Sequence, residues 1–198
     1  DFLCESKSKM HSLQVSYHSK WIRSGRKDFV ETIFFPVKSR NNWRITVACG
    51  KDGVDTIPYL ISYNNKGVTA SHIPFDDDSM PLMHFNTHFF KRYRERGRIT
   101  IEKPEDLVKN FFRKNVVLIP CYFSREDGTQ QLFTPLAGGV GLGNYHEESD
   151  ICEFKTFVDD SLLRQDQKDE ICNIWNQTAD DLMAEMQRRI DKRQSRKR

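Results

Sequence analysis

The stretch Asn86–Arg98, "NTHFFKRYRERGR", gathers side chains that suit acid–base chemistry on a phosphodiester. If it forms a helix, His88, Arg92, Glu95 and Arg96 share one stripe, because residues three and four apart are neighbours on a helix surface. An imidazole in the first turn, near the partly positive helix end, is expected to be largely neutral at pH 7 and able to take a proton. An arginine one turn further along can hold a phosphate beside it. The stretch therefore predicts His88 as an acid or base and Arg92 as its phosphate-binding neighbour.

The same residues also have an ordinary structural interpretation. Glu95 between Arg92 and Arg96 is a common surface ion-pair arrangement, and a histidine at a helix start often has no catalytic role. Residue types alone leave both interpretations open. The side chains that we expect to bind nucleic acid, if the stretch is functional, are Lys91, Arg94, Arg96, Arg98 and Lys155.

The order of strand and helix patterns along the chain predicts a single α+β domain spanning residues 1–198, and its elements must position these residues. Residues 12–73 are rich in strand-forming segments: "LQVSYH", "VETIFFPV", "WRITVAC", "PYLISYN" and "GVTASHI". A short helix pair is expected over residues 86–114, with Asn86 or Thr87 as the first cap and Pro104 in the first turn of the second helix. A second antiparallel strand group is expected over residues 116–158. The predicted fold is two antiparallel strand groups around a mid-chain helix pair.

A long C-terminal helix is predicted over residues 161–192, with Ser161 as its cap. Apolar residues recur along it at three- and four-residue spacing, from Leu163 through Trp175 to Ile190. This stripe either covers the sheet or forms a coiled-coil-like contact, so a protein partner or a homodimer through this helix is one expectation. From Gln187 onward the tail holds seven Lys or Arg against one Asp, which attracts polyanions such as RNA if it is not simply a solvated helix end.

A family resemblance adds to this interpretation. The order "THFFKRYRERGRI", then "PEDLVKNFF", then four expected strands resembles the H-x-x-x-R-x-x-E-R helix, second helix and sheet of some members of the barnase/EndoU/colicin/RelE-like nuclease superfamily. It covers residues 84–158 and implies metal-independent RNA cleavage. His88 would then be the acid or base, and Thr156, with Lys155 beside it, would contact the phosphate. The strand arginine of that superfamily has no evident counterpart in this chain.

Other patterns limit what else the chain does. "GGVGLG" at residues 138–143 leads into a strand rather than a helix, so it predicts a bent strand and not a nucleotide loop. The acidic run at residues 76–78 and "HEES" at residues 146–149 lack the spacing of known metal sites, so we expect no metal and no cofactor. No apolar run is long enough to cross a membrane, and five dispersed cysteines favour reduced thiols in the cytoplasm.

Two functions follow from these observations. The first is a metal-independent ribonuclease of the toxin or phage type, in which His88, Arg92 and Thr156 are the catalytic residues. The alternative is a non-enzymatic module that binds nucleic acid or a protein through its basic helix and tail.

The binding-module interpretation makes a prediction about salt. Phosphate contacts dominate binding without sequence preference, so the affinity for single-stranded RNA should fall steeply between about 50 and 200 mM salt. Fluorescence anisotropy with a labelled oligonucleotide measures this fall. Absent binding, or binding that salt does not weaken, contradicts the binding-module interpretation.

Overall fold

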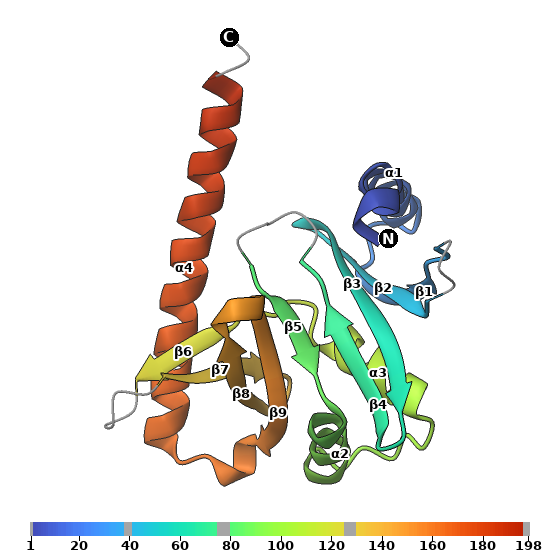
Figure 1. Ribbon diagram of the computed structural model, residues 1–198. Coiled ribbons are helices and arrows are strands. Elements are labelled where there is room, and N and C mark those ends of the chain that lie inside the picture. The colour runs from blue at the N-terminus through green and yellow to red at the C-terminus, as the bar shows by residue number, and fades with distance from the viewer. Residues whose placement is uncertain (1, 38–40, 75–79, 125–129, 196–198) are drawn as a thin grey trace.

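The computed structural model describes residues 2–37, 41–74, 80–124 and 130–195 and has the predicted α+β class (Figure 1). Its centre is a nine-stranded sheet with the order β1-β2-β3-β4-β5-β9-β8-β7-β6. The strands are β1 (Phe29–Phe34), β2 (Trp43–Gly50), β3 (Gly53–Asn64), β4 (Gly67–His72), β5 (Leu82–Phe85), β6 (Cys121–Ser124), β7 (Gln130–Leu136), β8 (Gly139–His146) and β9 (Ile151–Asp159). The helices are α1 (Phe2–Arg23), α2 (Thr87–Arg96), α3 (Pro104–Lys114) and α4 (Gln165–Ser195).

Two antiparallel halves make up the sheet, and one parallel pair joins them. Strands β1 to β5 follow one another in order, and β6 to β9 do the same. The halves meet where β5 runs parallel to β9, with Phe85 opposite Phe154 and His84 opposite Glu153. The two expected strand groups therefore form one continuous sheet.

The helix pair packs on one face of the sheet at this junction. Asn86 caps α2 as expected, since its side chain accepts a hydrogen bond from the backbone N–H of Phe89, and Pro104 stands in the first turn of α3. Phe85 is fully buried, with ring centroids 4.9 Å from those of Phe154 and Phe111. An aromatic core thus binds α2 and α3 to both halves of the sheet.

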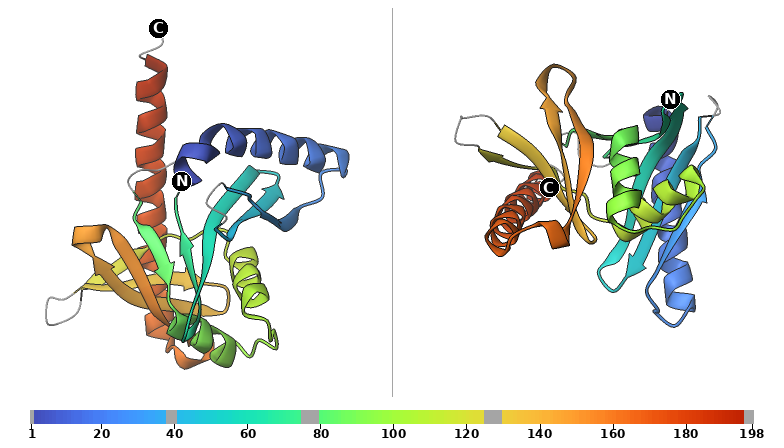
Figure 2. Two further views of the ribbon diagram at one scale, coloured as in Figure 1. Left: turned by 45° about the vertical axis from the view of Figure 1, so that its right-hand side comes forward. Right: turned by 90° about the horizontal axis from the view of Figure 1, so that it is seen from below.

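The other two helices cover the opposite face, one at each end of the sheet (Figure 2). Side chains alternate along a strand. Leu132 in β7 accordingly packs in the core with the helix pair, whereas Phe133 packs under α4 beside Trp175. At the other end, Ile45 of β2 packs under α1. Helix α4 extends well beyond the sheet (Figure 1). In the described part of the chain, no helix combines the length and the apolar character that a membrane crossing requires.

The segment "LQVSYH", predicted as a strand, is part of α1. The alternation of Val15 and Tyr17 suggested a strand, but the residues that reach the core are Met10, Leu13, Tyr17 and Trp21. Their spacing of three and four residues is that of a helix. The prediction was wrong because the buried set has a helical period.

Two further boundaries differ from expectation. Helix α4 begins at Gln165, because Asp159 caps a short 3-10 turn at Asp160–Leu162 and Ser161 bonds back to Asp159 instead of capping α4. Strand β5 was not predicted, since its four residues lie between the acidic run and α2. Residues 76–78 of that acidic run lie outside the described residues.

The aromatic core predicts the effect of truncating Phe85. Phe85→Ala should lower the free energy of unfolding by about 3 to 5 kcal/mol, because the cavity opens where both halves of the sheet and both helices meet. Chemical denaturation measures this. The matched control is Phe34→Ala, since Phe34 is 54% exposed, and its cost should stay below about 1 kcal/mol. Equal costs for the two variants would contradict the importance of the junction.

A buried histidine predicts how stability depends on pH. Burial lowers the pKa of His72 to about 4, although the hydrogen bond of its Nδ1 with the Pro58 carbonyl, 2.8 Å away, opposes the shift. Between pH 6.5 and pH 4, His72 becomes protonated in the unfolded chain but stays neutral in the folded chain. Stability is therefore lost as the pH falls through this window. The loss should reach roughly 3 kcal/mol at 1.4 kcal/mol per pKa unit. His72→Gln should remove this part of the pH dependence of unfolding, and His11→Gln on the exposed side of α1 should leave it unchanged.

Candidate functional site

The stripe of His88, Arg92, Glu95 and Arg96 on α2, which we call the α2 stripe, lies at the surface. His88 is exposed in the first turn, and Arg92 Nε donates to His88 Nε2 at 3.4 Å. Arg92 also pairs with Glu95 at 3.0 Å. An exposed ion pair of this kind adds less than about 1 kcal/mol to stability, so it holds Arg92 only weakly. His88 and Arg92 are therefore within reach of a ligand.

Arg96 belongs to the same stripe but has a structural contact. Its Nη1 donates to the backbone carbonyl of Phe157 at 2.7 Å, which fastens the end of α2 to β9. The basic side chains at Lys91, Arg94 and Arg98 are exposed instead. Lys91 and Arg94 on α2 and Arg98 just after it, rather than Arg96, therefore make an accessible positive surface.

The two predicted residues on β9 take different positions. Thr156 stands opposite Leu142, which packs under α4, so Thr156 points away from the face that α2 occupies. A register shift leaves Lys155 between the paired residues Phe154 and Thr156, and its Nζ lies 3.2 Å from Glu153 Oε2. The structure thus does not bring Thr156 to the α2 stripe, and it brings Lys155 to a carboxylate.

That carboxylate belongs to a polar cluster on the face opposite α2 and α3, which we call the junction cluster: Ser71, His84, Asn86, His146, Glu153 and Lys155. Ser71, His84 and Glu153 stand side by side in one row across β4, β5 and β9. Ser71 Oγ lies 2.9 Å from His84 Nδ1. His146 Nε2 lies 3.2 Å from Glu153 Oε2. The sheet junction therefore places two imidazoles, a carboxylate and an ammonium group together.

Asn86 connects this cluster with α2. Its Oδ1 accepts from the backbone N–H of Phe89 at 3.0 Å, and its Nδ2 donates to Glu153 Oε1 at 3.3 Å. One side chain therefore ends the helix and orients the carboxylate. His88 follows two residues later, so the N-terminal turn of α2 begins at the edge of the junction cluster.

The surroundings of His84 and Glu153 lower the pKa of both groups. Burial lowers the pKa of His84, and the nearby Glu153 carboxylate opposes part of that shift. Burial by itself raises the pKa of Glu153, but hydrogen bonds from His146, Asn86 and Lys155 outweigh it and hold the pKa below its ordinary value. At neutral pH His84 is therefore neutral and Glu153 is ionised.

The junction cluster is open to solvent between two helices. Helix α1 contacts β2 and β3, and α4 contacts β6 and β7, so the strands that carry the cluster lie between them. The side chain of Glu153 is 27% exposed, and those of Lys155 and His146 are 44% and 48% exposed. A ligand on this face of the sheet can reach all three. Among the described residues, no three His, Cys, Asp or Glu side chains lie close enough together to hold a metal ion.

Sequence reasoning missed most of this cluster. Five of its six members come from four strands, Asn86 is the cap of α2, and β5, which carries His84, was not expected as a strand. Ser71, His146 and Glu153 each stand in a segment that was expected to be a strand or its end, but nothing in the sequence indicates that β5 pairs with β9. Only that pairing brings Ser71 and His84 on one side together with His146 and Glu153 on the other.

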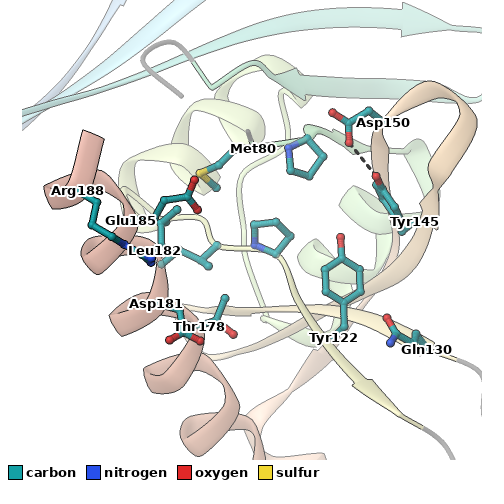
Figure 3. A pocket seen from close by; sticks show the side chains of 13 residues that line it. Met80, Tyr122, Gln130, Tyr145, Asp150, Thr178, Asp181, Leu182, Glu185 and Arg188 are labelled. Carbon is teal, nitrogen blue, oxygen red and sulfur yellow. Dashed lines mark hydrogen bonds between the residues drawn. The ribbon is translucent and has the colours of Figure 1, made fainter. Parts of the chain in front are cut away.

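A separate cavity of about 640 Å³ lies beside α4 and the β8–β9 hairpin (Figure 3). Tyr145 lines it, and Tyr145 and His146 are consecutive in a strand, so they point to opposite faces. Its other lining residues include Tyr122, Asp150, Asp181 and Glu185. No histidine is among the described residues that line this cavity, so the two imidazoles lie in the junction cluster and not here.

Comparisons with protein-family models, curated proteins and solved structures found no match for the chain.

The different environments of two arginines in α2 lead to a stability prediction. Arg96→Ala should lower the free energy of unfolding by about 1.5 to 3 kcal/mol, because it removes a charged donor from the Phe157 carbonyl. Arg94→Ala, an exposed control on the same helix, should change it by less than about 0.5 kcal/mol. Thermal or urea unfolding compares them, and equal stability of both variants would contradict the anchoring contact.

Proposed function

We propose that the protein is a ribonuclease that cleaves RNA by transphosphorylation at the junction cluster, without a metal. The observation that supports this most directly is the setting of Glu153. One carboxylate receives hydrogen bonds from His146, Asn86 and Lys155 and stands beside a second, neutral imidazole, His84, on an accessible face of the sheet. Two imidazoles and a lysine are the groups that this reaction needs.

Each group has a role that follows from its environment. Neutral His84, whose Nδ1 is bonded to Ser71, takes the proton of the ribose 2′-hydroxyl as its oxygen attacks phosphorus. His146, held at the Glu153 carboxylate, gives a proton to the departing 5′-oxygen as the P–O5′ bond breaks. Lys155 stabilises the charge that develops on the phosphate. The products are a 2′,3′-cyclic phosphate and a 5′-hydroxyl.

The RNA backbone follows the surface of α2 in this proposal. His88 lies in the first turn after Asn86, and Arg92 lies one turn further along α2. Lys91 and Arg94 are exposed on the helix, and Arg98 is exposed just beyond its end. These residues contact flanking phosphates, which gives affinity without reading bases. The roles suggested by the resemblance to the barnase/EndoU/colicin/RelE-like superfamily are thereby changed: His88 acts in binding, and Thr156 has no part.

We also propose that the protein acts in the cytoplasm, where RNA is abundant and thiols stay reduced. Four cysteines whose side chains the structure describes are free: Cys49, Cys121 and Cys152 are buried, and Cys172 is exposed. An exposed free thiol suits a reducing compartment.

The exposed basic side chains favour a second function, a module that binds RNA without cleaving it. Phosphate contacts alone would explain Lys91, Arg94 and Arg98, but they give no reason for the arrangement around Glu153. The assay below separates the two functions because only the first makes a product.

The proposal is tested by incubating RNA with the protein in EDTA and identifying the ends of the products. The wild type should release 2′,3′-cyclic phosphate ends. His146→Ala, Glu153→Gln and Lys155→Ala should each lower the rate, by roughly 100- to 10,000-fold for a positioned acid or base, while RNA binding persists.

Two control variants make this test specific. His11→Ala changes an exposed histidine on α1 and should leave the rate unchanged. His88→Ala should lower it by less than about tenfold, which is the expected effect of losing a binding contact and not a proton donor. The proposal is overturned if His146→Ala and Glu153→Gln still cleave RNA at the wild-type rate. It is also overturned if the wild type cleaves none of several RNAs.

A further inference from the structure

The cavity beside α4 suits a positively charged occupant. Asp150, Asp181 and Glu185 line it with carboxylates, and Arg188 is the basic residue among the described side chains that line it (Figure 3). Tyr122 and Tyr145, whose ring centroids are 5.8 Å apart, form its wall, and the Tyr145 hydroxyl donates to Asp150 at 2.9 Å. Aromatic rings and carboxylates together favour lysine or arginine side chains.

The helix that forms one side of this cavity has opposite charges at its two ends. From Gln165 to Met186 it carries six acidic residues and one lysine, whereas the chain from Gln187 to Arg198 carries seven basic residues and one Asp. The helix dipole favours such an order only within the first and last turns. It does not account for Asp180, Asp181 and Glu185, which lie in the middle of α4.

The charges at positions 181, 185, 188 and 192 form a self-complementary pattern. They are Asp, Glu, Arg and Lys, spaced by four, three and four residues, and such positions follow one stripe of a helix. Within one helix, Glu185 and Arg188 are one turn apart and stabilise the helix slightly. In two antiparallel copies, position 181 stands opposite 192, and 185 stands opposite 188, so every acid meets a base. A parallel arrangement places like charges together.

The basic end cannot occupy the cavity of its own chain. Helix α4 continues unbroken to Ser195, and its last turns lead away from the sheet and from the cavity, which Arg188 borders (Figure 1). An antiparallel second copy brings its basic end back toward the acidic part of the first. A twofold axis makes both contacts equivalent, as expected for a self-complementary surface.

We propose that two copies of this chain pair antiparallel through the C-terminal parts of α4, each placing its basic end against the acidic cavity of the other. The surface is separate from the junction cluster, so the pairing does not depend on the proposed reaction. Its attraction is largely electrostatic and is screened by salt.

The first measurement is the molar mass in solution, by light scattering or sedimentation equilibrium. A dimer is expected at low ionic strength, near 50 mM salt, and should dissociate near 500 mM, where the Debye length falls from roughly 14 Å to about 4 Å. A monomer under both conditions overturns the proposal.

Charge reversal gives the sharper test. The pair Asp181→Lys with Glu185→Lys makes the stripe entirely basic, and the pair Arg188→Glu with Lys192→Glu makes it entirely acidic. Each double variant should be monomeric alone, and the two mixed together should form a heterodimer. The control, Asp169→Lys with Asp180→Lys, changes the charge of α4 equally but off the stripe and should still dimerise. Circular dichroism checks that all variants fold.

The outcomes of the mixing experiment are decisive. A heterodimer that forms only from the two opposite variants confirms the antiparallel stripe. Double variants that dimerise alone, or that fail to associate when mixed, show that α4 does not pair in this way.

Discussion

The short parallel pairing of β5 with β9 is the interaction on which the rest of the structure depends. It joins two antiparallel half-sheets through only four paired positions. So few backbone hydrogen bonds stabilise a junction weakly, and most of its stability must come from packing. Phe85 and Phe154 stack at 4.9 Å, with an interplanar angle of 14°, and both rings belong to the core that α2 and α3 complete. The aromatic core under the helix pair therefore holds the two halves of the sheet together.

The same pairing also generates the junction cluster on the other face. In β5, Met83 and Phe85 point to the core, so His84 between them must point to the opposite face. In β9, Cys152 and Phe154 point to the core, so Glu153 between them points to the opposite face, where it lies beside His84. A slip of one residue would exchange the polar and apolar rows. The register that buries the phenylalanines is thus the register that brings the imidazole to the carboxylate.

Sequence patterns predicted the parts of this protein whose causes are local. The Asn86 cap and Pro104 at the start of α3 follow from residues within one or two turns of each other. Helix α1 was missed because Val15 and Tyr17 imitate a strand over a window too short to show the helical spacing. The junction cluster could not be predicted, because His84 in β5 faces a residue of β9, which is its neighbour in the sheet but comes four strands later in the chain. Local propensity carries no information about that pairing. Lys155 was singled out for its position beside Thr156, but its contact with Glu153 depends on the register shift opposite Leu142 and Gly143.

The junction pair also has a consequence for the order of folding. Each antiparallel half can form from strands that are near neighbours along the chain, whereas Phe85 and Phe154 must close a loop that contains both short helices and strands β6 to β8. Loop closure of this length is entropically costly and gains nothing until the distant strands meet. The halves should therefore form early and dock late. The cluster has members on both sides of the docking line. A chain whose halves have folded but not docked therefore keeps Ser71 beside His84 and His146 beside Glu153, but it lacks the contact of His84 and Asn86 with Glu153, and the complete cluster forms only with the last step of folding.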